Sequence, residues 1–179
     1  MKVSILSMTE DPEGTISRAA GTSYAKRDAK FSRVRNCFER GHMSVFEHAS
    51  VTFMAEGISR ACSHQLVRHR MASFVQESQR YVKLDVSGDW HEKPLSFDRS
   101  DELSRLFDAV MGASASAYEA ALEAGVKPED ARYLLPEAAK TSVCATMNWR
   151  EVYHFLDLRA DSRAQWEIRA LAGELAREL

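Results

Sequence analysis

The chain lacks the signatures of several large protein classes. It has only three cysteines in 179 residues, an odd number with no CxxC spacing. This argues against a disulfide framework or a zinc site and favours reduced thiols. No apolar run is long enough to span a bilayer, and the first residues read as a short strand rather than a signal peptide. We therefore expect a cytoplasmic protein that does not enter a membrane.

Glycine-rich phosphate loops are also missing. The sequence contains neither GxGxxG nor GxxxxGK[ST], which excludes a Rossmann dinucleotide turn and a P-loop. Any phosphate on a ligand must then be held by side chains and helix termini. The formal net charge is -2, so the whole surface does not favour a nucleic acid, and basic character is local.

The apolar patterns predict an α+β fold in a single domain covering residues 1–179. Alternating apolar residues predict strands at residues 3–6, 49–55 and 141–147. Helical spacing predicts a helix at residues 15–40 that Gly21 interrupts and Gly41 stops, a helix at residues 57–70, and a helix at residues 100–125 that Ser100 caps. Further helices are predicted at residues 128–136 and 150–159, with a last helix after a capping box of Ser162 and Gln165. We expect a small, mostly antiparallel central sheet flanked by helices, with a helical segment beside it.

Positive charge gathers at one point of this layout. Arg68-His69-Arg70 is followed after seven residues by Ser78 and then by Arg80. A guanidinium is always charged and fits phosphate or carboxylate with a planar fork of donors. Since an uncompensated buried charge costs roughly 3–5 kcal/mol, the density of cations beside apolar residues predicts a pocket for a phosphorylated ligand. Gln65, Arg68 and His69 are expected on one flank of the predicted helix.

This arrangement resembles the signature of the flavin-dependent thymidylate synthases. Further segments resemble that family in the family's order, and together they are far more specific than an Arg-His-Arg triplet: Gly41-His42-Met43-Ser44-Val45-Phe46-Glu47-His48, Ile58-Ser59-Arg60, Gln65-Leu66-Val67, Ser78-Gln79-Arg80-Tyr81, Ala131-Arg132-Tyr133-Leu134-Leu135-Pro136, Asn148-Trp149-Arg150, His154-Phe155 and Leu158-Arg159-Ala160-Asp161-Ser162.

The resemblance implies a reaction and its partners. Members methylate dUMP at uracil C5 to give dTMP, with carbon from methylenetetrahydrofolate and hydride from FADH2, the FAD being reduced by NADPH. They are homotetramers with shared active sites. No enzymic nucleophile attacks the uracil, so catalysis depends on positioning and on polarising the ring. The sequence agrees, because it offers many arginines and no convincing pair of nucleophile and base.

The resemblance also assigns residues. Arg159 is implied to be catalytic, holding the uracil edge and favouring ionisation at N3. The implied substrate-binding residues are Gln65, Arg68, Gln76, Glu77, Ser78, Gln79, Arg80, Arg132 and Arg159. The implied FAD-binding residues are Ser44, Glu47, Arg68, His69, Arg70, Gln76, Asn148, Trp149, Arg150 and His154, with His42 and His48 close to the flavin. No metal is implied.

The residues alone also allow simpler interpretations, each a local pairing or a structural role. These are Arg159 paired with Asp157 or Asp161, Arg132 paired with Glu129 or Asp130, Arg80 as a loop charge, the Arg68-His69-Arg70 cations at a helix C-terminus, Glu47 as a solvated charge, and His154 or His48 as structural histidines.

The sequence departs from the family in three places. Val75 and Gln76 stand where many members carry Asn and Glu, although Gln76 still offers a donor and an acceptor. Arg163 stands where many members have a histidine near FAD. The segment between Tyr81 and Ser100 is short, which bears on folate and NADPH contacts more than on the central chemistry.

Two functions from other classes are alternatives. A metal-dependent hydrolase would use His42, His48, His64 and His69, but no HExxH pattern is present. A small RNA-binding module would use Arg68, Arg70 and Arg80 with Tyr81 and Trp90 for stacking, and the net charge argues against it.

Overall fold

A computed structural model describes residues 1–26 and 28–179. The chain divides into two compact units, which we describe separately. Unit 1 comprises Met1–Glu56, Gln65–Val75 and Val143–Leu179, and unit 2 comprises Gly57–His64 and Gln76–Ser142.

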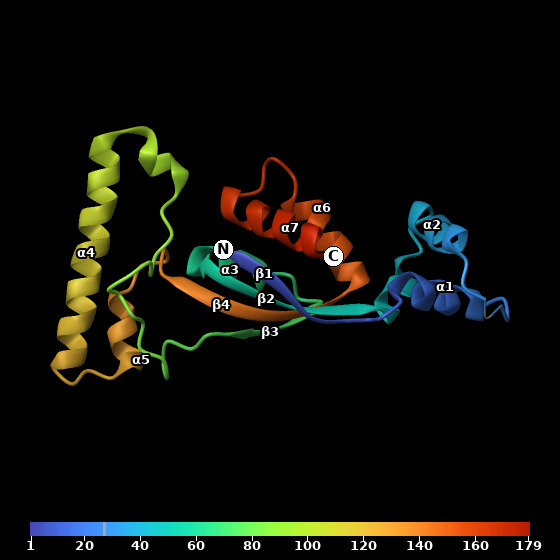
Figure 1. Cartoon of the computed structure of the whole chain (residues 1–179), viewed down its shortest axis with the longest axis horizontal. Helices are drawn as coiled ribbons and strands as arrows, with labels where there is room; N and C mark the ends of the chain where they lie inside the picture. The colour runs from blue at the N-terminus through green and yellow to red at the C-terminus, as the bar shows by residue number, and fades with distance from the viewer. Residues whose placement is uncertain (27) are drawn as a thin grey trace. The chain divides into compact units, whose positions relative to one another are not determined.

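Unit 1 is built on a sheet with the strand order β1-β2-β4-β3 (Figure 1). Strands β1 and β2 pair antiparallel, with a register irregularity between Ile5 and Ser7. The predicted α+β class and small antiparallel sheet are confirmed. The strand bounds are β1 Lys2–Met8, β2 Ser50–Ser59, β3 Ala72–Gln76 and β4 Lys140–Asn148; the ends of β2 and β3 and the start of β4 belong to unit 2.

Alternating burial confirms the two longest predicted strands. In β2 the side chains of Val51, Phe53 and Ala55 are buried, and every second residue of β4 is buried in the same way. The Thr52 and Thr146 hydroxyl groups lie 2.9 Å apart between these neighbouring strands. The alternation that places one face of each strand in the core is therefore readable from the sequence.

Strand β3 was missed, because it is short and none of its residues is fully buried.

Helices α6 (Trp149–Arg159) and α7 (Trp166–Glu178) pack on each other, and α7 packs on β1 (Figure 1). The predicted helix at 150–159 is confirmed, and the Asn148 side chain caps it by accepting a hydrogen bond from the Glu151 N–H at 2.9 Å. The predicted capping box at Ser162 is wrong. Gln165 is itself the N-cap, since its side chain accepts from the N–H groups of Glu167 and Ile168.

The predicted helix at residues 15–40 forms as two helices, α1 (Pro12–Thr22) and α2 (Phe31–Glu39), followed by a 3-10 turn η1 (Met43–His48). Gly21 lies inside α1, so the break falls after it. The predicted stop at Gly41 is confirmed, because this residue adopts φ +70°, which favours glycine.

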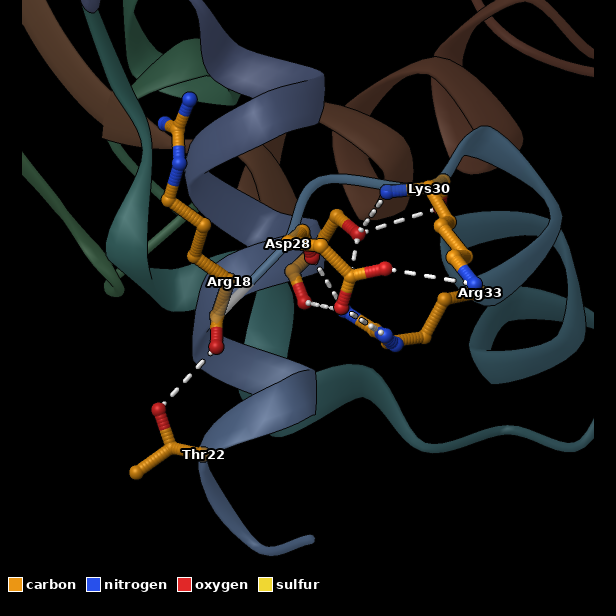
Figure 2. A network of polar contacts seen from close by, with 6 residues as sticks. Arg18, Thr22, Asp28, Lys30 and Arg33 are labelled. Atoms are coloured by element: carbon orange, nitrogen blue, oxygen red, sulfur yellow. Dashed lines mark hydrogen bonds and ion pairs between the residues drawn. The ribbon is translucent and has the colours of Figure 1, made fainter. Parts of the chain in front are cut away.

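A polar network ties the start of α2 to α1 (Figure 2). Arg33 donates from Nη1 to the Ser17 carbonyl at 2.9 Å and to the Asp28 carbonyl at 2.7 Å, and its Nη2 lies 3.1 Å from Asp28 Oδ1. The Ser17 hydroxyl accepts from the Lys30 N–H at 2.7 Å. These bonds to charged groups hold the segment from Asp28 to Arg33 against α1.

The helix expected to begin at Gly57 and carry the arginine cluster is wrong. Strand β2 continues through Gly57 to Ser59, and helix α3 spans only Arg60–Leu66. The Ser59 hydroxyl accepts a hydrogen bond from the Cys62 N–H at 3.0 Å, as an N-cap does. The Arg68-His69-Arg70 segment therefore lies in the turn after the helix.

Unit 2 contains the long helix α4 (Asp101–Glu123), the short helix α5 (Pro128–Ala131), and the 3-10 turns η2 (Leu95–Arg99) and η3 (Arg132–Leu134). Ser100 caps α4 by accepting from the Leu103 N–H at 3.2 Å, as predicted. The predicted helix from Pro128 forms but becomes η3 before Pro136. The core of unit 2 includes Trp90, Phe107, Met111 and Ala139. In the described part of the chain, no helix is both long and apolar enough to cross a membrane.

Candidate functional site

Two residues predicted for the site, together with a third polar residue, form a hydrogen-bonded row in unit 1. His69 follows α3, and both Glu151 and Arg159 project from α6. His69 Nδ1 lies 2.9 Å from Glu151 Oε1, and Arg159 donates from Nε to His69 Nε2 at 3.0 Å. A second Arg159 nitrogen, Nη2, lies 3.5 Å from the Gln65 carbonyl. We call Glu151, His69 and Arg159 the relay.

The relay has one consistent protonation pattern. Arg159 has only donors, so His69 Nε2 must accept, and Nδ1 must carry the proton that is donated to the Glu151 carboxylate. Only 3% of the His69 surface and 5% of the Glu151 surface are exposed. Burial lowers the pKa of His69, the Glu151 hydrogen bond opposes this, and the Arg159 charge lowers the pKa further. The imidazole is therefore neutral at physiological pH.

A cavity of about 810 Å³ lies beside the relay within unit 1. Its lining includes Glu151 of the relay and His154, whose ring centroid lies 5.6 Å from that of His69. The volume is within the usual range of small-molecule and cofactor sites, roughly 300–1,000 Å³. The lining residues are Phe38, Met43, Met71, Asn148, Arg150, Glu151, Tyr153, His154, Leu156 and Asp157.

These lining residues suit a flavin. Aromatic and aliphatic groups, among them Phe38 and Tyr153 with ring centroids 5.0 Å apart, can cover a planar ring system. Arg150 supplies a cation for an anionic group. Asn148, Arg150 and His154 were predicted to bind FAD, so the fold brings three predicted residues to one cavity.

Other predicted flavin residues lie outside that lining. Glu47, on η1, forms an ion pair with Arg150, so it is not simply a solvated charge. Ser44 is exposed on the same turn. Trp149 lines a second cavity of about 470 Å³, and its buried indole Nε1 has no hydrogen-bond partner among the described residues.

The flanking arginines Arg68 and Arg70 are both exposed. In the described part of the chain, no ion pair involves either of them. Their charge is thus not buried, and the expected desolvation cost does not apply to these two side chains. Both remain available to an anion. Gln65 contributes its backbone carbonyl to Arg159.

Unit 2 carries the remaining predicted substrate residues. Arg80 pairs with Glu129 at 3.2 Å, and Arg132 donates from Nε to the Glu129 carbonyl at 3.0 Å. The Ser78 hydroxyl accepts from the Arg80 N–H at 3.2 Å. In this unit Ser78 is thus a turn residue and not a nucleophile paired with a general base.

The other predicted members of this group are Gln76, Glu77 and Gln79. The Gln76 amide donates to the Ser63 hydroxyl at 3.0 Å, while Gln79 is buried and its Nε2 has no hydrogen-bond partner among the described residues. Glu77 is exposed and its carbonyl accepts from Arg60 Nη2 at 3.1 Å.

Sequence reasoning gave no role to Arg60. Its Nε is buried without a partner in the described structure. Burial lowers the pKa of Arg60, and the nearby charge of Arg132 lowers it further. The charges of Glu77 and Glu137 oppose this lowering of the pKa. The unpartnered Nε is a buried donor that an anion can satisfy. The Ile58-Ser59-Arg60 block was the available signal.

Glu151 was the other residue that sequence reasoning missed. It follows Arg150 directly in a quoted block, but nothing in the sequence shows that it faces His69, 82 positions away.

Local contacts exclude some of the simpler interpretations. Asp161 binds Arg163 rather than Arg159. Arg163, which stands where many members have a histidine near FAD, is therefore held in a local pair. Trp90 is 6% exposed in the core of unit 2, so it is no stacking platform for RNA.

Of the four histidines named for the hydrolase, only His69 belongs to the group of described residues that lie close enough to share a metal ion. His69, Glu151 and His154 offer ligand atoms within 4.8 Å of one another, whereas His64 pairs with Glu137 at 3.3 Å in unit 2. The Arg159 guanidinium bonded to His69 opposes a cation at this position.

Comparison with known proteins identifies the family. The family model described as thymidylate synthase complementing protein matches residues 4–179. The flavin-dependent thymidylate synthase of Geobacter sulfurreducens is 46% identical over 188 residues, covering 99% of this chain and 81% of the relative. That of Pyrococcus furiosus is 41% identical over 192 residues, covering 100% and 79%. The chain belongs to the flavin-dependent thymidylate synthase family.

Solved structures agree with this assignment. A flavin-dependent thymidylate synthase from Helicobacter pylori complexed with FAD and dUMP aligns with a TM-score of 0.77 and 25% identity, covering 100% of this chain and 94% of that one. The UMP/dUMP methylase PolB from Streptomyces cacaoi, bound with 5-Br dUMP, aligns with a TM-score of 0.83 and 26% identity, covering 98% and 88%. The predicted family, thymidylate synthase activity, methyltransferase class and FAD cofactor are thereby confirmed.

Proposed function

We propose that this chain methylates C5 of dUMP with Arg159 as its catalytic residue, using methylenetetrahydrofolate as carbon donor and FAD, reduced by NADPH, as hydride donor. The observation that supports this assignment is the position of Arg159. Its guanidinium is anchored through Nε and Nη2, which leaves Nη1 and part of Nη2 for a ligand. An arginine fixed in this way is preorganised for an anion that forms during reaction.

Arg159 acts on the uracil ring. Two of its N–H groups directed at the ring edge stabilise the negative charge that develops when N3 ionises. That charge makes C5 more nucleophilic without a covalent bond to the protein. The neutral His69 does not donate from Nε2 to the uracil anion, because this nitrogen accepts a hydrogen bond from Arg159.

The 810 Å³ cavity of unit 1 is proposed to hold FAD. When bound, FAD supplies the hydride. Asn148, Arg150 and His154 orient it through hydrogen bonds and charge, and Phe38 and Tyr153 exclude water from its ring. Glu47 fixes Arg150 through their ion pair. Ser44, Arg68, His69, Arg70, Gln76 and Trp149 remain predicted FAD residues.

Nucleotide phosphate binding is assigned to the cations of unit 2. Arg80 and Arg132 are predicted from the family, and we add Arg60 because of its unpartnered Nε. Each charge-assisted bond to phosphate is worth roughly 1.5–3 kcal/mol. Gln65, Arg68, Gln76, Glu77, Ser78 and Gln79 complete the predicted substrate-binding set.

The assembly and cell compartment also remain proposals. We propose a homotetramer with active sites shared between subunits, in the cytoplasm. The three cysteines are free in the described structure, which fits a reducing compartment.

The visible absorption spectrum of the purified protein tests this function. We expect flavin bands that shift when dUMP is added, and dTMP formation when methylenetetrahydrofolate and NADPH are present. UMP is the matched control, because the neighbour from Streptomyces cacaoi is a UMP/dUMP methylase. A colourless protein that binds no added FAD, or methylation of UMP in preference to dUMP, would contradict the proposal.

A further inference from the structure

We propose that Glu151 is a positioning residue that holds the catalytic guanidinium of Arg159 in place through His69. This inference rests on the proposed function, because it requires Arg159 to act on the substrate. Glu151 lies in the lining of the cavity proposed for FAD, and it acts on Arg159 through the imidazole.

The direction of each hydrogen bond is the first argument. Since Arg159 can only donate, the ring must present a lone pair at Nε2, and the proton must lie on Nδ1. Glu151 at 2.9 Å from Nδ1 is the acceptor that makes this tautomer the stable one. With the opposite tautomer, two N–H groups would face each other across the 3.0 Å between Nε2 and Nε. Glu151 therefore selects the tautomer on which the Arg159 anchor depends.

Charge balance is the second argument. Glu151 and Arg159 carry opposite charges on either side of a neutral ring, so the buried carboxylate and the half-buried guanidinium compensate each other through it. The Glu151 N–H is also held, because it donates to the Asn148 side chain that caps α6. Glu151 and Arg159 belong to one helix, which fixes the distance between them.

Packing around the ring is the third argument. The His69 ring lies against Phe155, with centroids 5.0 Å apart, and against His154 at 5.6 Å. Both neighbours come from α6, so the imidazole cannot turn freely to find other partners. A rigid ring between two polar partners transmits the position of one to the other.

The expected effect is on turnover more than on substrate affinity. A guanidinium that swings away from its anchored position loses the interaction made in the transition state, so kcat falls more than KM changes. A misplacement of about 1 Å can cost about 100-fold in rate. We expect Glu151→Ala to lower kcat by roughly 10- to 100-fold and to change KM for dUMP by less than about threefold.

The test uses the FAD-loaded enzyme and compares Glu151→Ala with Glu151→Gln. The glutamine carbonyl still accepts the proton of His69 Nδ1, so Glu151→Gln should restore kcat to within about fivefold of the wild type. Glu167→Gln, which alters a buried glutamate on α7, is the control and should keep wild-type kcat and KM. His69→Ala with and without Glu151→Ala forms a cycle in which the second change should add nothing.

The outcomes separate the inference from the function on which it rests. No dTMP from the wild-type enzyme would refute the proposed function, and full turnover by Arg159→Ala would refute both. Wild-type kcat in Glu151→Ala, a Glu151→Gln enzyme as slow as Glu151→Ala, or additive losses in the cycle would overturn the inference alone.

If Glu151→Ala does not fold, solid-state NMR of the wild-type enzyme with ¹⁵N-histidine decides, with the His69 signal assigned by a His69→Gln variant. A neutral ring protonated at Nδ1 supports the relay, and protonation at Nε2 overturns it.

Discussion

Replacing Arg159 by alanine is expected to lower the rate of methylation strongly while FAD stays bound. In the structure Nε is used by His69 and Nη2 is directed at Gln65, which leaves N–H groups for one or two bonds to the uracil edge. A hydrogen bond to a charged group contributes roughly 1.5–3 kcal/mol, which corresponds to roughly 10- to 150-fold in rate. Loss of one or two such bonds thus lowers kcat by about 10- to 10,000-fold.

The same substitution should barely change FAD binding, because Arg159 is absent from the lining of the 810 Å³ cavity. The assay combines dTMP quantification by chromatography with flavin absorbance on one protein sample. Arg159→Lys is the intermediate variant, because a lysine keeps the charge but lacks the planar fork of donors that joins His69 and a substrate. Its rate should lie between those of the wild type and Arg159→Ala. Equal losses of FAD and activity, or a wild-type rate in Arg159→Ala, would refute the argument.

Three other outcomes are expected. Arg80→Ala should raise the Kd for dUMP by roughly 10- to 150-fold and leave the Kd for FAD unchanged. Glu129→Gln removes the negative charge that pairs with Arg80 and should not weaken dUMP binding. Calorimetry measures both affinities, and equal losses for the two ligands in Arg80→Ala would contradict the assignment. Ser100→Ala should reduce the free energy of unfolding by about 1 kcal/mol because it removes the α4 cap. Ser116→Ala, on an exposed part of α4, should cause no such reduction, and equal reductions for the two variants in urea unfolding would refute the capping role. Burial lowers the pKa of His69, so at mildly acidic pH the unfolded chain binds a proton that the folded chain does not, and the free energy of unfolding should decrease as the pH falls below the ordinary histidine pKa of 6.5. Urea unfolding at pH 7.5 and 5.5 should show a smaller decrease in His69→Phe than in the wild type, and an equal decrease in the two proteins would contradict this.

Much of the fold followed from local patterns. The alternation in residues 49–55 and 141–147 predicted β2 and β4, and the cap at Ser100 predicted the start of α4 within one residue. Failures occurred where two local signals competed. Gly57 suggested a helix start, but Ile58 and Ser59 are both buried in the strand, and the Ser59 cap sets the beginning of α3.

The candidate site was predicted only in part. Arg159, His154, Arg150 and Asn148 stood in segments that resemble the family, and the fold places them on or next to α6. The role of Glu151 was not predictable, because its partner His69 lies on a distant segment. The role proposed for Arg60 was not predictable either, since a buried unpartnered Nε exists only once the chain is folded.

By itself the sequence determined the family, the α+β class, and which arginines and histidines are available for a phosphorylated ligand, because motif order and periodicity are local properties of the chain. Only the tertiary structure decided the partners of those residues: it buried His69 between Glu151 and Arg159, left Arg68 and Arg70 exposed, and paired Arg163 with Asp161. The physical reason is that a hydrogen bond depends on distance and direction in space, and two residues 82 positions apart acquire these only when the chain folds.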